Sequence, residues 1–188
     1  MPQGTGLVIG DVVGRGVQAA SQVAQLRSAV RVLALIDGYR PSRLIQLLDQ
    51  LVGGTDKIEE TTLAYASVDA GSGEVVFSNA GQCPPLLLTS PGAAEFLGGG
   101  LSGLLGVLGG GPKPDAEVRL VPGSVLLLFT AGLVQSRDTS MTEGLQQLRR
   151  AVANGPADLE ALCDHVLEVC LREPRDDDVS VLAVSLCP

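Results

Sequence analysis

The apolar positions of the first forty residues follow two different periods. Residues 5–13 form a mostly apolar run that ends at glycines, which predicts a buried strand. Residues 16–36 carry apolar side chains near helical spacing, which predicts a helix that ends before Pro41. We expect this helix to bury one face, made of Val17, Ala20, Val23, Ala24, Ala29 and Leu33.

Further along the chain, helical and strand patterns continue to alternate. A second helix is expected over 41–54, with a proline at its start and glycines at its end. Strands over 61–68 and 74–79 flank a glycine-rich turn and predict a β-hairpin. The remaining expected elements are hairpins around Pro91-Gly92 and Pro122-Gly123, a helix over 156–173 opened by Pro156 and Asp158, and a strand over 177–186.

Consecutive hairpins with helices between groups of strands indicate the α+β class. The chain has 188 residues and contains neither an internal repeat nor a long linker, so we expect a single domain over 1–188. Hydrophobic residues make up 45% of the chain and aromatic residues only 3%, so the core must consist mainly of Val, Leu and Ala.

Charge and cysteine content narrow the function classes. A formal net charge of -8 argues against a nucleic-acid partner or an anionic membrane surface, since both attract clustered Lys and Arg. The apolar loop 97–111 is too short and too rich in glycine to span a bilayer. The four cysteines form no C-x-x-C pair and no signal peptide is visible, so we expect free thiols and a cytoplasmic protein.

The stretch "GDVVGRG" is the first candidate site. Gly14, Gly16 and Ala19 match a dinucleotide fingerprint after a strand, and Asp37 lies where a ribose-binding acid would fall. Asp11 would however place a negative charge near the pyrophosphate. A carboxylate at a strand end beside open backbone also suits a divalent cation, and a plain tight turn is the third interpretation.

Two other stretches stand at strand ends. Asp176, Asp177 and Asp178 precede the last apolar strand, and three adjacent carboxylates repel one another unless they are solvated or bound to cations. The apolar block "SVLLLFTAGLVQS" stops at Thr130-Ala131-Gly132, where Ala131 offers no chemistry. A solvated loop remains the plainer interpretation of the three aspartates.

Four ordered motifs together resemble one family. They are "GLVIGDVVGRGVQAA", "TTLAYASVDAGSGEVVFSNAGQCPPLLL", "LVPGSVLLLFTAGLVQSR" and "RDDDVSVLAV". They are similar to motifs of the metal-dependent protein phosphatases (PPM), in the bacterial branch typified by the stage II sporulation protein E and the stress-response sigma-regulator phosphatases. The resemblance implies an α-β-β-α sandwich of two antiparallel sheets flanked by helices. It also implies two Mg²⁺ or Mn²⁺ ions that activate a water for attack on phosphoserine or phosphothreonine.

The resemblance assigns roles residue by residue. Asp11 matches the metal-bridging acid, Val12 a residue that binds metal through its backbone carbonyl, and Asp177, with Asp178 beside it, the acid of the final motif. On this basis Asp11 and Asp177 are the expected catalytic residues, and Asp11, Val12, Asp177 and Asp178 the expected metal ligands. No cofactor-binding residue beyond these is expected.

This sequence departs from the family pattern at several positions. Ala131 stands where the family has a metal-binding Asp, and the opening G-G-D-x-Y-D motif with the family's first strands is absent. Ser124 and Gln135 stand where acids are usual, and Gln82 where His is usual. Because two divalent ions need several carboxylates, we expect fewer ions here and a weak or lost activity.

Three functional hypotheses follow. The first is a protein serine/threonine phosphatase of the anti-sigma-antagonist type, acting weakly or not at all on a phosphorylated regulatory protein. The second is a non-catalytic pseudo-phosphatase that binds a protein partner. A dinucleotide-binding enzyme is a distant third. Bare sheet edges further predict a homodimer, strand exchange or an upstream sensor domain.

Overall fold

A computed structural model describes most of the chain, in seven segments (4–14, 16–36, 40–54, 61–90, 92–107, 111–171 and 177–186). The chain splits into two compact units, each of which is built from two separate stretches. Unit 1 comprises Met1–Gln82 and Gly98–Arg119, and unit 2 comprises Cys83–Leu97 and Leu120–Pro188. Asp37 and Asp176 lie outside the described residues.

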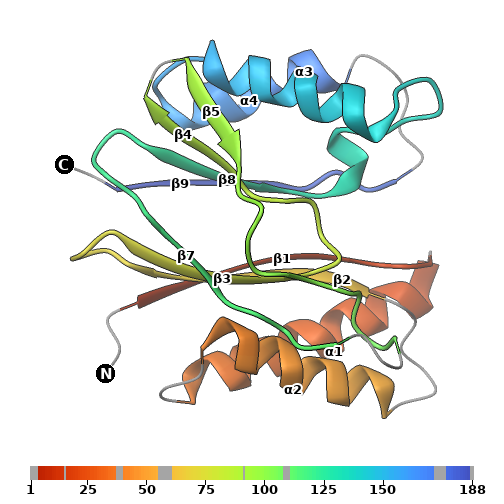
Figure 1. Ribbon diagram of the computed structural model, residues 1–188. Coiled ribbons are helices and arrows are strands. Elements are labelled where there is room, and N and C mark those ends of the chain that lie inside the picture. Colours follow the sequence, from red (N-terminus) through yellow and green to blue (C-terminus); the bar gives the residue numbers. More distant parts are fainter. Residues whose placement is uncertain are drawn as a thin grey trace. The chain divides into compact units, whose positions relative to one another are not determined.

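Unit 1 contains a five-stranded sheet in the order β1-β2-β3-β6, with β7 also pairing with β3 (Figure 1). Pairing is antiparallel except between β3 and β6. Because β1 stands first in this order, it forms the edge of the sheet. The strands are β1 (Gly4–Val12), β2 (Thr61–Asp69), β3 (Glu74–Ala80), β6 (Leu101–Ser102) and β7 (Ala116–Arg119).

Helices α1 (Gly16–Leu35) and α2 (Pro41–Gly53) cover one face of this sheet (Figure 1). The expected buried face of α1 is wrong in part, because Val17 and Val23 are exposed. The buried residues are instead Gln22, Leu26 and Val30, spaced by four, so that they form one stripe along the helix. Apolar residues occur on every side of α1, and the sequence pattern alone does not single out the stripe that packs.

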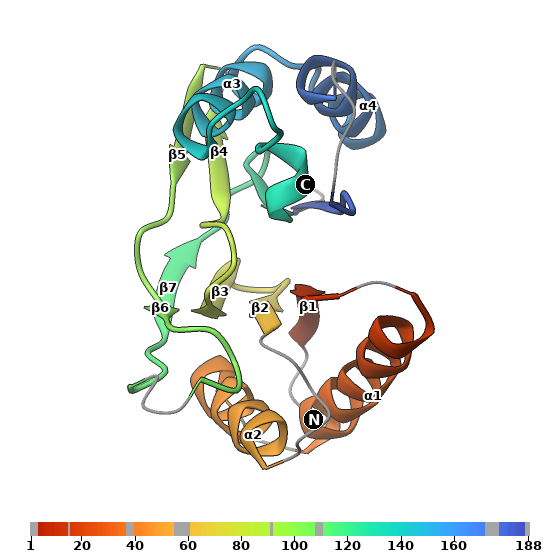
Figure 2. The same ribbon diagram turned by 90° about the vertical axis from the view of Figure 1, so that its right-hand side faces the viewer.

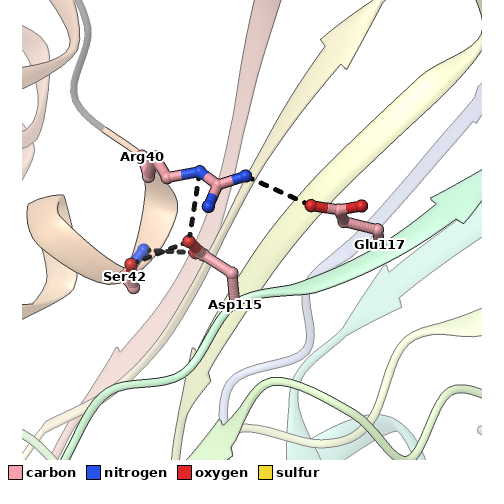
Figure 3. A network of polar contacts seen from close by, with 4 residues as sticks. All are labelled: Arg40, Ser42, Asp115 and Glu117. Atoms are coloured by element: carbon pink, nitrogen blue, oxygen red, sulfur yellow. Dashed lines mark hydrogen bonds and ion pairs between the residues drawn. The ribbon is translucent and has the colours of Figure 1, made fainter.

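The first turn of α2 is held by a carboxylate from a distant part of the chain (Figure 3). Asp115 accepts hydrogen bonds from the Ser42 amide at 2.7 Å and from the Ser42 hydroxyl at 2.8 Å. Arg40 pairs with Asp115 at 3.7 Å and with Glu117 at 3.2 Å. Since Arg40 offers no side-chain cap of its own, Asp115 satisfies a first-turn amide that has no partner within the helix, at the positive end of the helix.

Unit 2 contains a four-stranded antiparallel sheet in the order β5-β4-β8-β9, with helices α3 and α4 on one face (Figures 1 and 2). All five residues of β8 are buried, and Leu127 and Phe129 pack in the core with Leu148 of α3 and Val166 of α4. The elements are β4 (Leu86–Ser90), β5 (Ala93–Phe96), β8 (Val125–Phe129), the 3₁₀ turn η1 (Ala131–Leu133), α3 (Met141–Ala153), α4 (Leu159–Cys170) and β9 (Val181–Ser185).

The hairpin expected around Pro122-Gly123 does not form. β7 pairs with β3 in unit 1, whereas β8 pairs with β4 and β9 in unit 2. The turn itself exists, since the Ser124 amide donates to the Val121 carbonyl at 2.9 Å and the Ser124 hydroxyl donates to the same oxygen. A tight turn therefore joins strands of two different sheets, which a local pattern cannot distinguish from a hairpin.

The α+β class is confirmed, since the described residues form two largely antiparallel sheets and four α-helices. Helix α3 was not expected from the sequence, and β9 begins at Val181, four residues later than expected. In the described part of the chain, no helix combines the length and the apolar character needed to cross a bilayer.

Candidate active site

The first group of candidate residues lies where β1 ends in unit 1. Asp11 pairs with Thr62 and Val12 with Thr61, in register with the start of β2. The Val12 side chain is buried in the core beside Leu26, so its backbone carbonyl is the only group it can offer to a ligand. Asp11 is half-buried at the last position but one of the strand, which gives its carboxylate a rigid support.

Polar side chains from three strands gather around this strand end. The Thr62 hydroxyl donates to the Asp11 carbonyl at 3.4 Å and accepts from the Gln82 side-chain amide at 3.2 Å. Asn79, fully buried, donates to the Gln82 carbonyl at 2.9 Å and accepts from the Gln82 amide at 2.8 Å. Gln82 therefore has a structural role, linking the turn after β3 to the ends of β1 and β2.

The turn between β1 and α1 uses two glycines in the left-handed region, with φ of 119° at Gly14 and 80° at Gly16. These glycines produce the sharp strand-to-helix change that the motif predicted. The strand they follow is paired antiparallel with β2. A dinucleotide fingerprint belongs instead to a parallel β-α-β unit, so this topology removes the main support for a nucleotide site.

The second group lies where β8 ends in unit 2. Thr130 is buried, and its hydroxyl donates to the Asp178 carbonyl at 3.1 Å while accepting from the Ser180 amide at 2.9 Å. The Thr130 amide also donates to the Ser180 carbonyl at 3.1 Å. These three hydrogen bonds hold the segment before β9 against the end of β8.

Gly132 completes this contact between the two segments. A Cβ atom at Gly132 would lie 2.5 Å from the Asp178 carbonyl oxygen, so only glycine allows the backbones to approach this closely. Ala131 lies between Thr130 and Gly132, is half-buried, and is the first residue of the 3₁₀ turn. Asp177 and Asp178 are exposed beside this turn. The structure thus brings Ala131, Asp177 and Asp178 together, while Asp11 and Val12 belong to unit 1.

Comparison with known proteins matches this chain to one family and to solved structures. The family model described as stage II sporulation protein E (SpoIIE) matches residues 2–186. The chain belongs to the SpoIIE family. It is 30% identical to a solved chain holding the RsbU and RsbW domains of Rv1364c from Mycobacterium tuberculosis, with a TM-score of 0.87, covering 100% of this chain and 55% of that one.

Two more distant structures share the SpoIIE-family fold. The PP2C phosphatase domain of SpoIIE from Bacillus subtilis, solved with a fragment of its regulatory domain, is 16% identical with a TM-score of 0.77, covering 98% of this chain and 54% of that one. RsbX in complex with magnesium is 16% identical with a TM-score of 0.68, covering 96% and 80%. The family and the fold are those of PP2C-type serine/threonine phosphatases, and this chain spans about half the length of two of these relatives.

The oxygen donors at the two strand ends of this SpoIIE-family chain are of the type that a hard divalent cation binds, but few of them lie together. Carboxylate and carbonyl oxygens are the ligands that Mg²⁺ and Mn²⁺ prefer. Among the described residues, however, no three His, Cys, Asp or Glu side chains gather in a group that could hold a metal ion. Ala131 adds a methyl group at the strand end where the Asp177 and Asp178 carboxylates are exposed. Among the described residues, each strand end taken by itself therefore has fewer carboxylates than two divalent ions would need.

Cysteine chemistry gains no support from the structure. Burial raises the pKa of the Cys83 thiol to about 11, so that this side chain remains protonated at neutral pH. A protonated thiol is a poor nucleophile.

Sequence reasoning missed the two threonines that hold the ends of the candidate strands, Thr62 and Thr130. Both occupy motif positions, but their hydroxyl groups act on backbone atoms far away in sequence, and a one-dimensional pattern cannot assign such partners. A threonine at the end of an otherwise apolar strand, as in "LLLFT", was the available signal.

Proposed function

We propose that this chain is a protein serine/threonine phosphatase domain of the SpoIIE branch whose own hydrolytic activity is weak or lost. The family and fold support the phosphatase class. The observation that carries the weak activity is Ala131. It stands in a turn that Thr130 and Gly132 hold against Asp178, and it presents a methyl group at that position.

In this proposal Asp11 and Asp177 are the catalytic residues. Asp11, the Val12 carbonyl, Asp177 and Asp178 are the ligands for Mg²⁺ or Mn²⁺, and fewer than two ions are retained. A bound ion of this kind supplies a Lewis acid and an acidified water. The protein contributes fixed strand ends, and the hydrogen bonds of Thr62 and Thr130 keep the backbone at each end in place.

The proposed substrate is a phosphorylated regulatory protein of the anti-sigma-antagonist type. Support comes from the relatives, one of which carries an RsbW domain in the same chain as its RsbU domain. The net charge of -8 is unfavourable for a nucleic-acid partner and disfavours an anionic membrane surface. A cytoplasmic location, and a homodimer or an upstream sensor domain, are further parts of the proposal.

The second candidate is a pseudo-phosphatase that binds the regulatory protein without hydrolysing it. Ala131 favours this function too. Gln82 also favours it, because its backbone amide, its carbonyl and its side-chain amide all make hydrogen bonds within unit 1. The two candidates differ in one measurable respect, which is whether any turnover depends on Asp11 and Asp177.

The test combines metal binding with hydrolysis. Mn²⁺ binding is measured by calorimetry, and phosphate release from a phosphoserine peptide is followed in the same buffer, for the unmodified chain and for Asp11→Asn and Asp177→Asn. Asp138→Asn serves as the matched control, because Asp138 is an exposed carboxylate outside the proposed ligand set. We expect at most one ion per chain and a slow turnover that both site variants abolish.

Three other outcomes would change the conclusion. Two ions per chain with rapid turnover would contradict the proposed weak activity and the pseudo-phosphatase alike. Turnover that survives in Asp11→Asn and Asp177→Asn would place the chemistry elsewhere. Absence of any phosphate release above the buffer, from the unmodified chain and the variants alike, would select the pseudo-phosphatase.

A further inference from the structure

Unit 1 contains a cavity of about 860 Å³ between the sheet and its two helices. The first half of β1 lines it with Gly4, Gly6 and Val8, and the second half of α1 lines it with Val30 and Ala34, among others. Gly4 and Gly6 present no side chain to the cavity, and the Tyr65 hydroxyl occupies the place of a Gly6 side chain. Its volume is within the range of small-molecule sites, roughly 300–1,000 Å³.

The cavity is mainly apolar but has a polar group in its wall. Tyr65 is buried, with only 7% of its surface exposed. Its hydroxyl lies over Gly6, where a Cβ atom would come within 2.5 Å of it. No hydrogen bond is found for this hydroxyl among the described residues, and the hydroxyl is not one of the fully buried, unpaired polar atoms, so it is open to the cavity. Burial raises the pKa of Tyr65, so the hydroxyl is a proton donor throughout the neutral range.

The charged residues among the described lining of the cavity are all arginines. Arg27, Arg31 and Arg40, all exposed, line it, and no Asp or Glu does among the described residues, although the chain carries 21 acidic residues and 13 basic ones. Arg40 is engaged by Asp115 and Glu117 (Figure 3). Arg27 and Arg31 lie one turn apart on α1, and within the described residues neither has an ion-pair partner. Like charges at this spacing repel each other, which an anion between them would relieve.

We propose that this cavity binds a small amphiphilic carboxylate, with an aliphatic body against the apolar walls and its carboxylate at Arg27, Arg31 and the Tyr65 hydroxyl. The ligand differs from the phosphorylated substrate of the proposed function in place as well as in chemistry. Val8, the cavity residue of β1 nearest to Asp11 in sequence, lies three residues or roughly 10 Å from it, and because side chains alternate along a strand the two face opposite sides of the sheet. The phosphatase site and this cavity therefore use different parts of unit 1.

The test uses octanoate and its uncharged analogue 1-octanol, with binding followed by amide chemical shifts in NMR spectra of the full chain. We expect octanoate to shift the amides of Gly4 and Gly6. The double variant Arg27→Gln/Arg31→Gln should weaken octanoate binding roughly tenfold, because two charge contacts are lost, while changing octanol binding less than about twofold. Tyr65→Phe should weaken octanoate binding roughly tenfold through one lost hydrogen bond to a charged group.

The matched control is Arg149→Gln/Arg150→Gln, which removes two adjacent exposed arginines from unit 2 and should leave octanoate binding unchanged. Equal binding of octanoate and octanol would overturn the proposal, because the arginines would then not select an anion. Absence of octanoate binding would overturn it as well. A concentration-dependent dimer that protects the β1 amides would in that case assign this face to a second copy of the chain.

Discussion

The end of β1 in unit 1 and the end of β8 in unit 2 are built alike but finish in different side chains. At each end a threonine hydroxyl bonds a backbone carbonyl of a second segment, Thr62 to Asp11 and Thr130 to Asp178. The first end presents the Asp11 carboxylate, and the second presents the Ala131 methyl group. The threonine hydrogen bond that fixes a strand end can therefore be kept while the carboxylate at that end is lost.

The two supports also differ in strength. Thr130 is buried and makes hydrogen bonds of 2.9 and 3.1 Å, whereas Thr62 is half-buried with contacts of 3.2 and 3.4 Å. Short contacts in a buried place contribute more to stability than long contacts near water. The end of β8, which lacks the carboxylate, is thus held by the stronger hydrogen bonds. This is expected if these hydrogen bonds also stabilise the fold.

The largest expected effect comes from Thr130→Val, which keeps the side-chain shape and removes the hydroxyl. The Ser180 amide and the Asp178 carbonyl then lose a partner, and the free energy of unfolding should fall by about 2–4 kcal/mol. Urea unfolding measures this change. Thr89→Val, at an exposed threonine with one contact of 3.3 Å, is the control and should cost less than about 0.5 kcal/mol. A loss below about 1 kcal/mol at Thr130 would mean that the backbone hydrogen bond from Thr130 to Ser180 and the close approach at Gly132 suffice to hold the two segments together.

The next prediction gives the end of β8 the side chain it lacks. Ala131→Asp adds a carboxylate beside Asp177 and Asp178, and Mn²⁺ affinity measured by calorimetry should rise about tenfold, or roughly 1.4 kcal/mol. Ala70→Asp adds the same charge at the exposed turn after β2 and controls for the change in net charge. If both variants bind Mn²⁺ equally, the gain reflects overall charge and the site is incomplete for another reason.

Thr62→Val tests the weaker support at Asp11. Because Thr62 is half-buried and its contact to the Asp11 carbonyl is 3.4 Å, the free energy of unfolding should fall by only about 1 kcal/mol. Urea unfolding beside Thr130→Val compares the two strand ends directly. A loss as large as that of Thr130→Val would remove the difference between them.

Local patterns in the sequence predicted most elements whose partners are near in the chain. The hairpin of β2 and β3 formed at the expected residues, and α4 begins after Asp158, whose side chain accepts from the Ala161 amide at 3.0 Å. The predictions were wrong where contacts between residues distant in the sequence determine the pairing of a strand or the buried face of a helix. The turn at Pro122-Gly123 joins two sheets, and the stripe of α1 that packs includes Gln22, a polar residue.

The candidate site shows the same limit. The motifs indicated that Ala131 stands at the end of a buried strand, and it lies two residues after the last residue of β8, with Thr130 between them. Which atoms hold that end depends on the Thr130 contacts to residues about 50 positions later, and no periodicity reports them. The roles of Asp11, Val12, Asp177 and Asp178 remain predictions that the metal and turnover measurements address.

Helix α3 was missed because Gly144 weakens its helical pattern. A Cβ atom there would overlap the carbonyl oxygen of Val134, so close packing requires glycine inside this helix despite its cost of about 1 kcal/mol. The available signal was Ser140 followed three residues later by Glu143, which form a capping box. The Ser140 hydroxyl donates to the Glu143 carboxylate at 2.6 Å and accepts from the Glu143 amide at 3.4 Å.

The smallest expected effect comes from Ser140→Ala, which removes this cap and should lower the free energy of unfolding by about 0.5–1 kcal/mol at neutral pH. Its pH dependence has a definite sign. The hydrogen bonds from the Ser140 side chain and amide hold the pKa of Glu143 below its usual 4.5. The contribution of Glu143 is therefore fully present above that value and is lost as the pH falls through the lower, folded-state pKa.

The difference in stability between the unmodified chain and Ser140→Ala should accordingly narrow as the pH is lowered from 6 to about 3. In the variant, the Glu143 pKa measured by NMR should return toward its usual value. Ser28→Ala is the control, because Ser28 bonds the Ala24 carbonyl inside α1 and caps no helix. A stability difference that stays constant with pH would show that the Ser140 hydroxyl acts on the helix amide alone, and that the carboxylate of Glu143 adds nothing to the start of α3.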